Sequence, residues 1–250
     1  MRILQLANSD AGHTTGVAEG ERSYRIVQRM LAEASGEDVE TVLRVIWPSP
    51  DLPDIVDRWM DRYAPDVVVF HMNGYWYLYQ SVPLKLERKL GRWGRPLTGV
   101  GFGMGRNRIA ETTLFQRIRT LLVRTVGGAY YFTPKEVIDT VDACVRRILA
   151  REGTTLMVRG NLLGWSEGAH GAEAEVHRAV SRLAAELHFT FLARDPREPV
   201  AGQDLYQSGD RLHASGAVHL LFGEREGQAL VQAWNHAHGE NAAAAVLTSR

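Results

Sequence analysis

The sequence predicts a doubly wound α/β fold, in which helices cover both faces of a parallel sheet. Two observations support this prediction. Residues 66–72 contain a continuous apolar run of the kind found in strands that are covered on both faces. Along most of the chain, short apolar runs alternate with segments whose apolar residues recur at helical spacing. That alternation is typical of strand-helix-strand units that build a parallel sheet.

The predicted elements follow one another in a regular order. Strands are expected at 3–7, 39–46, 66–72, 155–159 and 189–193, and helices at about 21–34, 54–63, 134–151, 172–187 and 217–237. The second strand ends at Trp47-Pro48-Ser49-Pro50, because a proline can neither continue a ladder nor sit inside a helix. Since no internal repeat or low-complexity linker interrupts the pattern, we expect residues 1–250 to form a single domain.

The middle of the chain departs from this rhythm. Residues 75–133 hold an aromatic run (75–79), a helix, a glycine-rich turn and a second helix near 111–126, and we expect a helical, cap-like insertion beside the site. The aromatic run fits either core packing or a wall that contacts substrate. Between Lys85 and Arg124 there are ten Lys or Arg residues against two Glu. This basic segment fits a solvated helical face, a partner surface or an attractor for anionic substrates.

Length and composition indicate a globular protein with a sizeable core. The chain has 250 residues, 45% of them hydrophobic, and its 29 basic and 29 acidic residues cancel, so no global field argues for a nucleic-acid or membrane partner. The single cysteine, Cys144, excludes an intramolecular disulfide, and its place in a helical pattern predicts a buried small hydrophobe. No segment approaches ~18 consecutive apolar residues, and the N-terminus leads straight into a strand, so we expect a cytoplasmic protein.

The sequence offers little support for a cofactor or a metal. The glycines of residues 99–105 fit no frame of G-x-G-x-x-G, and no strand leads into them, which indicates a loop without a phosphate-binding role. No helix carries paired histidines with a carboxylate at metal-ligand spacing, and His236 and His238 are expected to be solvated. We therefore expect no metal and no cofactor.

A carboxylate and an imidazole lie three residues apart near the C-terminus, at Asp210 and His213. On a turn that enters a helix, Asp210 can hold one ring nitrogen of His213 while the other acts as a general base toward a hydroxyl. The alternative is that Asp210 merely caps the following helix. Ser166 is a formal nucleophile in Gly164-Trp165-Ser166-Glu167-Gly168, but three residues separate this motif from the strand before it and three from the helix after it. A nucleophile elbow joins both elements directly, so Ser166 is better interpreted as a loop or cap serine.

Ser9 is the better candidate nucleophile. Ala7-Asn8-Ser9 ends the first predicted strand, Asn73 follows the third, and Asp210-x-x-His213 comes near the end of the chain. With these residues in this order, nearly the whole sequence resembles the SGNH/GDSL hydrolases. The resemblance implies that Ser9 is the nucleophile, that Asp210 and His213 complete its triad, and that Asn73 binds the oxyanion with the help of a backbone N–H.

The motifs depart from the family pattern at three places. Gly-Asp-Ser has become Ala7-Asn8-Ser9, and Gly-x-Asn-Asp has become His71-Met72-Asn73-Gly74. Where the family's oxyanion glycine follows the second strand, this chain has Pro48-Ser49-Pro50, and only Ser49 has an N–H to donate. Taken by themselves, Asn73-Gly74 is also an ordinary turn signal and Ser9 an ordinary turn cap.

The resemblance implies a flavodoxin-like three-layer α/β/α sandwich, the SGNH-hydrolase fold, that cleaves carboxylic esters. Ser9, Asp210 and His213 are the expected catalytic residues, while Asn73 and Ser49 would bind the oxyanion and Tyr75 and Trp76 the substrate. A small-molecule or carbohydrate ester with an acetyl or short acyl group is the expected substrate. Two alternatives stay open, namely an acyltransferase that uses the same residues and a catalytically inactive binding module of the same fold.

Overall fold

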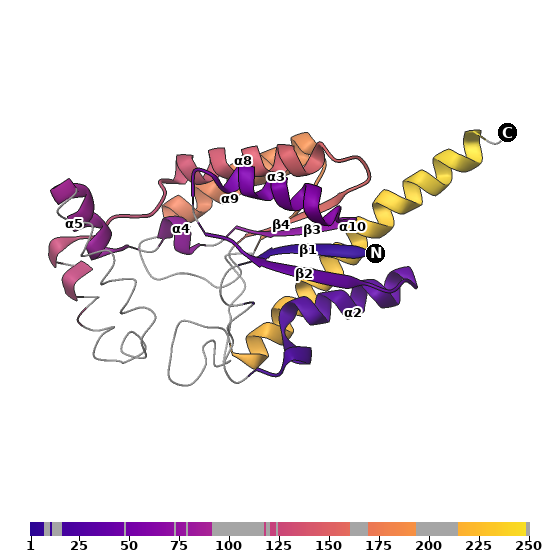
Figure 1. Ribbon diagram of the computed structural model, residues 1–250, viewed down its shortest axis with the longest axis horizontal. Helices are drawn as coiled ribbons and strands as arrows, with labels where there is room; N and C mark the ends of the chain where they lie inside the picture. Colours follow the sequence, from indigo (N-terminus) through magenta and orange to yellow (C-terminus); the bar gives the residue numbers. More distant parts are fainter. Residues whose placement is uncertain are drawn as a thin grey trace.

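The computed structural model describes residues 1–7, 11, 17–47, 49–72, 74–78, 80–91, 118, 121–123, 125–160, 170–193 and 215–248, without the side chains of residues 75, 170 and 240–248. Its centre is a five-stranded parallel sheet in the order β2-β1-β3-β4-β5 (Figure 1). The strands are β1 (Arg2–Ala7), β2 (Glu40–Val45), β3 (Val67–His71), β4 (Thr155–Arg159) and β5 (Thr190–Leu192). This is the flavodoxin-like strand order, and it confirms the predicted fold class.

Helices cover both faces of the sheet. They are η1 (Glu19–Glu21), α2 (Ser23–Ser35), α3 (Leu52–Tyr63), α4 (Tyr75–Leu78), α5 (Val82–Leu90), α8 (Pro134–Leu149), α9 (His170–Leu187) and α10 (Gly216–Thr248). Figure 1 shows α3, α8 and α9 on one face and α2 and α10 on the other. Each predicted strand and each of the five predicted regular helices is present. The largest difference is α10, which continues beyond residue 237, because four successive alanines at 242–245 favour helix where no apolar periodicity marks it.

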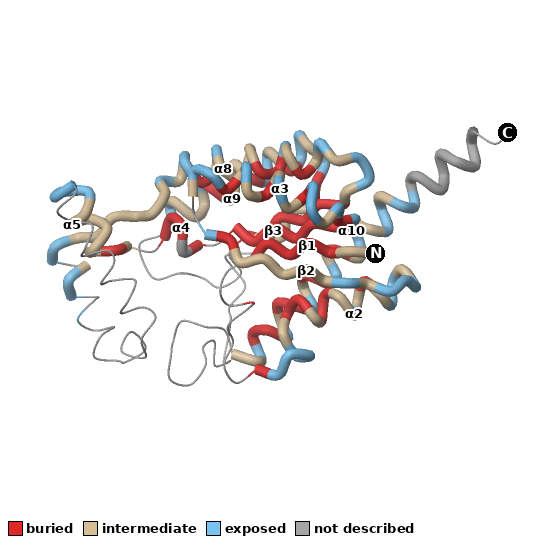
Figure 2. The backbone as a smooth tube through the Cα atoms, viewed as in Figure 1, coloured by how far each residue is buried: buried red, intermediate tan, exposed pale blue. Residues whose placement is uncertain are grey.

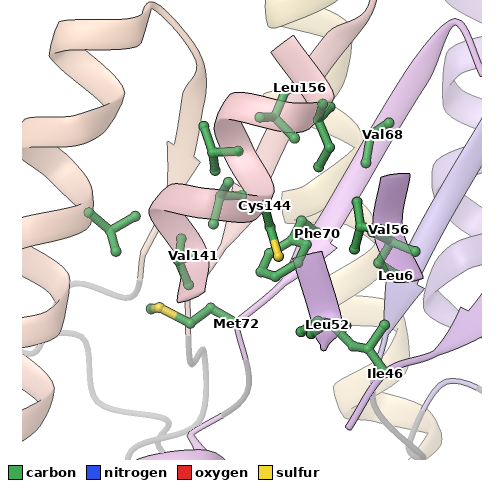
Figure 3. Packing of buried hydrophobic residues seen from close by; sticks show 14 of the residues in the cluster. Leu6, Ile46, Leu52, Val56, Val68, Phe70, Met72, Val141, Cys144 and Leu156 are labelled. Carbon is green, nitrogen blue, oxygen red and sulfur yellow. The ribbon is translucent and has the colours of Figure 1, made fainter. Parts of the chain in front are cut away.

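The two faces of the sheet bury different sets of side chains, because successive residues of a strand point to opposite faces. Leu6, Val68 and Phe70 belong to the larger cluster, which α3, α8 and α9 complete. Figure 3 shows this cluster, with Cys144 among its apolar side chains. Cys144 is buried, as the sequence predicts, and burial raises the pKa of its thiol to about 12.

The smaller cluster lies between the sheet and the pair α2 and α10. Ile3, Val67, Val69 and Met157 point into it from the strands, and Val27, Leu31 and Leu230 from the helices. The buried segments drawn in Figure 2 are accordingly concentrated in the central strands and in the inner sides of the helices. Three strands also carry polar residues on this same face, and Gln5, His71 and Arg159 among them are described with the site.

Two glycines let α10 pack closely against α2. A Cβ added at Gly223 would lie 2.7 Å from Cβ of Ile26, and one added at Gly227 would overlap the sulfur of Met30. Any larger residue at position 223 would therefore force the helices apart, because the branched Ile26 side chain has little freedom to move. The close packing fixes α10 on the sheet face that it shares with α2.

Two residues within the predicted insertion at 75–133 lie side by side. Ser81 and Ala129 form an isolated antiparallel bridge, with Ser81 N–H donating to Ala129 O (2.9 Å) and Ala129 N–H to Ser81 O (3.0 Å). α4 packs into the core, whereas α5 lies away from the sheet (Figure 1). Most of the second predicted helix, near 111–126, lies outside the described residues, although 118, 121–123 and 125–126 are helical. Ser9 also lies outside the described residues, so a cap over the site by the insertion stays a prediction.

Candidate active site

The candidate site lies at the carboxyl edge of the sheet, between β1 and β3. The chain leaves β1 toward β2 on one side and later reaches β3 on the other, so this is the topological switch point where such sheets bind ligands. β1 ends at Ala7 and β3 at His71, on neighbouring strands that pair Leu6 with Phe70. Ser9 and Asn73 each follow two residues after these strand ends.

Four of the expected site residues lie outside the described residues, namely Ser9, Asn73, Asp210 and His213, and so does the alternative nucleophile Ser166. Their roles therefore stay predictions. α10 begins at Gly216, three residues after His213. Figure 1 shows α10 starting on the side of the sheet where the strands end and running back along it. The segment with Asp210 and His213 thus leads into a helix that starts on the expected side.

Ser49 is half-buried at the turn between β2 and α3. Its hydroxyl accepts a hydrogen bond from Asp51 N–H (3.2 Å), and its carbonyl accepts one from Leu52 N–H (3.0 Å). Just before it, Ile46 N–H donates to Ala7 O (2.8 Å), which holds the end of β2 beside the end of β1. A role for Ser49 N–H in binding an oxyanion stays a prediction.

The aromatic run after Asn73 enters α4 directly. Trp76 is 1% exposed and makes edge-to-face contacts with Phe70 and Phe132, at centroid distances of 6.3 and 6.4 Å. The aromatic run was expected either to pack in the core or to contact substrate, and Trp76 packs in the core. Tyr77 is also buried, and burial raises the pKa of its hydroxyl above the ordinary range. A contact between Tyr75 and substrate stays a prediction, because the Tyr75 side chain is not described.

A buried polar cluster, here called the Glu226 cluster, was not predicted from the sequence. It consists of Gln5 on β1, His71 on β3, Arg159 on β4 and Glu226 on α10. Arg159 Nη1 donates to Glu226 Oε1 (2.6 Å), and His71 Nε2 lies 3.1 Å from Glu226 Oε2. The side chains of Glu226 and His71 are only 0% and 4% exposed. The side chain of Arg159 is 12% exposed, so the cluster places the opposite charges of Arg159 and Glu226 in the interior.

The partners of His71 determine its protonation. The Glu226 carboxylate can only accept, so His71 Nε2 carries the hydrogen, and Arg159 can only donate, so Nδ1 (3.4 Å from Arg159 Nη1) accepts. The Gln5 amide lies beside the same nitrogen, with Gln5 Nε2 3.2 Å from His71 Nε2. The hydrogen bond to Glu226 and the contact with Arg159 together make His71 the neutral Nε2–H tautomer.

The electrostatics of the Glu226 cluster agree with this assignment. Burial, and then the charge of Arg159, lower the pKa of His71, which keeps its ring neutral. Burial by itself would raise the pKa of Glu226, but Arg159 and His71 together lower it below its ordinary value. The guanidinium of Arg159 also lies 4.6 Å from the ring centroid of Phe222, one turn before Glu226. Glu226 and Arg159 are thus a charged pair, and His71 is a neutral hydrogen-bond partner.

One signal in the sequence points to this cluster. Val218, Phe222, Glu226 and Leu230 follow one another at a spacing of four on α10, and all four are buried. A carboxylate in the apolar stripe of a helix needs a buried partner, so the stripe itself indicates a hidden charge. The identity of the partners depends on the register of β3 and β4, which pairs His71 with Arg159.

The chain was compared with known families, curated proteins and solved structures. No family model and no curated protein sequence matches it. The structure of TesA matches with a TM-score of 0.59 at 14% identity, over 93% of this chain and 99% of that one. A lipolytic protein of the G-D-S-L family from Desulfitobacterium hafniense matches with a TM-score of 0.50 at 11% identity, over 91% and 98%. The chain has the SGNH/GDSL-hydrolase fold.

The likeness extends over nearly the whole length of further proteins with the SGNH/GDSL fold. The psychrotrophic esterase EstA from Pseudoalteromonas sp. matches with a TM-score of 0.56 at 13% identity, over 94% of this chain and 98% of that one. At these identities the likeness establishes the fold, which is the fold that the motifs at Ser9, Asn73 and Asp210 predict. Which residues act on this SGNH/GDSL scaffold is argued from the chain's own sequence.

Across the described ranges, no group of three or more His, Cys, Asp or Glu side chains is placed to hold a metal ion. Within the same part of the chain, no helix is long and apolar enough to cross a membrane. His236 and His238 are exposed on α10, as predicted, and His238 stacks on Trp234.

Proposed function

We propose that this protein is a serine esterase that hydrolyses a carboxylic ester at the carboxyl ends of β1 and β3. One observation carries the proposal: Ser9 and Asn73, which match the family motifs in order, follow strands that are neighbours at the switch point of the sheet. α10, which follows Asp210 and His213, begins on the same side. Esterases share this fold, among them EstA, whose structure was determined inhibited by monoethylphosphonate.

In the proposed reaction, Ser9 Oγ attacks the ester carbonyl carbon while His213 accepts the hydroxyl proton. The carbonyl electron pair moves to the oxygen, and Asn73 with the N–H groups of Ser9 and Ser49 stabilises the resulting oxyanion. When the pair returns, the bond to the leaving alcohol breaks and His213 gives that alcohol its proton. Water then attacks the acyl-enzyme by the same route, and Asp210 orients the imidazole throughout.

The proposed substrate is a small-molecule or carbohydrate ester with an acetyl or short acyl group. Two structures with this fold support the carbohydrate class. The acetyl xylan esterase AlAXEase matches with a TM-score of 0.52 at 11% identity, over 92% of this chain and 99% of that one. A carbohydrate esterase family 2 enzyme from Corynascus thermopiles matches with a TM-score of 0.54 at 14% identity, over 94% of this chain and 66% of that one.

The departures from the family motifs favour a second candidate, a catalytically inactive binding module. Ala7-Asn8 replaces Gly-Asp before Ser9, and Gly74 replaces the aspartate after Asn73. Neither departure removes the nucleophile or the triad residues, so we retain the esterase as the proposed function. An acyltransferase would use the same residues, and it would differ in that an added sugar or alcohol outcompetes water for the acyl group.

Labelling with a fluorophosphonate probe tests the esterase directly. We expect a covalent adduct on Ser9 of the wild-type protein, located by peptide mass spectrometry, and none on Ser9→Ala. With a p-nitrophenyl ester, Ser9→Ala should lose on the order of 10⁴- to 10⁶-fold in kcat, as a triad nucleophile does, while Ser166→Ala should lose little. An adduct on Ser166, or full turnover by a folded Ser9→Ala, would show that the assignment is wrong. A wild-type protein that stays unlabelled would favour the binding module.

A further inference from the structure

The Glu226 cluster lies where the segments that carry the candidate site residues leave the fold. Gln5 lies on β1, four residues before Ser9 in the sequence, and His71 is the last residue of β3, two residues before Asn73. Glu226 belongs to α10, the helix that follows Asp210 and His213. The cluster thus connects three segments that are far apart in the sequence and that share one functional edge.

His71 itself is a departure from the family motif. In Gly-x-Asn-Asp the residue two positions before the asparagine is a glycine, whereas this chain places a buried imidazole there. A buried imidazole must find hydrogen-bond partners, and here Glu226 and Arg159 supply them on opposite nitrogens. The added side chain is therefore tied to its surroundings, together with the backbone that carries it.

We propose that Glu226 is a positioning residue for the oxyanion site, acting through His71 and Arg159 to fix the end of β3 from which Asn73 extends. Glu226 binds Arg159 with one oxygen and His71 with the other, and these two residues are direct cross-strand partners. Beyond them, Met72 N–H donates to Arg159 O (2.8 Å), so the ladder continues to the residue before Asn73. This role rests on the proposed esterase function.

A positioning role differs measurably from a purely structural one. Removing Glu226 alone leaves Arg159 as an unpaired buried charge, which destabilises any protein. In Arg159→Met/Glu226→Leu no charge is left unpaired, so this double variant should lose less stability than a variant that lacks Glu226 alone, while His71 still loses its two partners. Because the oxyanion forms only during the reaction, a displaced Asn73 should lower kcat and leave KM nearly unchanged. The exposed Glu224 on the same helix supplies a matched control, Glu224→Gln.

The experiment measures urea unfolding, kcat and KM for a p-nitrophenyl ester, and the rate constant of fluorophosphonate labelling. We expect Glu226→Gln and the double variant to lose about 10- to 100-fold in kcat and in labelling rate, the range for a misplacement of about 1 Å. The KM should change less than about threefold, and Glu224→Gln should match wild type. Nitrogen NMR of the wild-type protein should show His71 as the neutral Nε2–H tautomer.

The outcomes separate this inference from the proposed function. If the wild-type protein reacts with the probe at Ser9 and the folded double variant reacts equally fast, Glu226 has only a structural role and the inference is wrong. A protonated or Nδ1–H His71 would equally overturn it, whatever the activity. If the wild-type protein does not react at all, the esterase proposal is wrong, and the positioning role, which depends on it, is wrong as well.

Discussion

Gly223→Ala should destabilise the protein, although alanine is the better helix former. The added Cβ would lie 2.7 Å from Cβ of Ile26, 2.8 Å from its Cδ1 and 3.0 Å from its Cγ2. Carbon atoms pack at about 3.5 to 4.0 Å, so α10 and α2 would have to separate by roughly 0.8 Å or more. The substitution therefore acts on a close contact between the two helices, against a branched side chain that has little freedom to move.

The expected size follows from two opposing effects. Overpacking of this kind costs about 1 to 3 kcal/mol, and three close contacts to a branched side chain put Gly223→Ala near the upper end. Replacing glycine by alanine inside a helix returns about 1 kcal/mol. The free energy of unfolding should therefore fall by about 2 kcal/mol. Gly239→Ala, in the same helix but with no atom within 4 Å of the added Cβ, should be neutral or stabilising by up to about 1 kcal/mol.

Urea unfolding followed by circular dichroism measures this difference. For an m-value of about 3 kcal/mol/M, a loss of 2 kcal/mol lowers the midpoint by about 0.7 M. The midpoint of Gly239→Ala should stay the same or rise. If Gly223→Ala were as stable as the wild-type protein, the close packing of α10 against α2 would be refuted, and with it the placement of Glu226 against the sheet.

Two further predictions concern buried groups. Because the pKa of His71 is lowered in the folded state, the unfolded chain binds a proton at higher pH, so the free energy of unfolding should decrease as the pH falls below about 6.5, the value for free histidine. His71→Gln should show a shallower decrease between pH 6.5 and 5 in urea unfolding, and an identical slope would contradict the burial of a neutral imidazole. Cys144, whose raised pKa keeps the thiol protonated, should react with iodoacetamide at pH 8 only in denaturant, and rapid alkylation of the native protein would show that its helix is misplaced.

The fold could be predicted because each strand and helix carries its own local signal. β3 is a short apolar run, and α8 begins at Pro134, where Thr133 caps the helix and forms a capping box with Glu136. The inserted segment was recognised only as a break in the pattern, since nothing local marks the pairing of Ser81 with Ala129. That pairing joins residues far apart in the sequence, which periodicity alone does not reveal.

The site, too, has residues that local sequence predicts and residues that only the folded chain brings together. Ser9 and Asn73 are predicted because they resemble the family motifs and follow strand ends, and both of these are local features of the sequence. The Glu226 cluster was missed because His71 looks like one more member of a buried strand, and its charged partners lie on β4 and α10. Only the alternation of side chains along three strands and the facing side of one helix bring these residues together.

The bridge between Ser81 and Ala129 holds together two residues that are 48 positions apart in the sequence. Since Ser81 and Ala129 pair at this bridge, the chain leaves and rejoins the described fold at one point. A shortened or exchanged segment between them costs little in loop-closure entropy as long as its ends still meet. A change in the length of residues 82–128, which include the basic segment, should therefore leave the five strands and their packing unaltered.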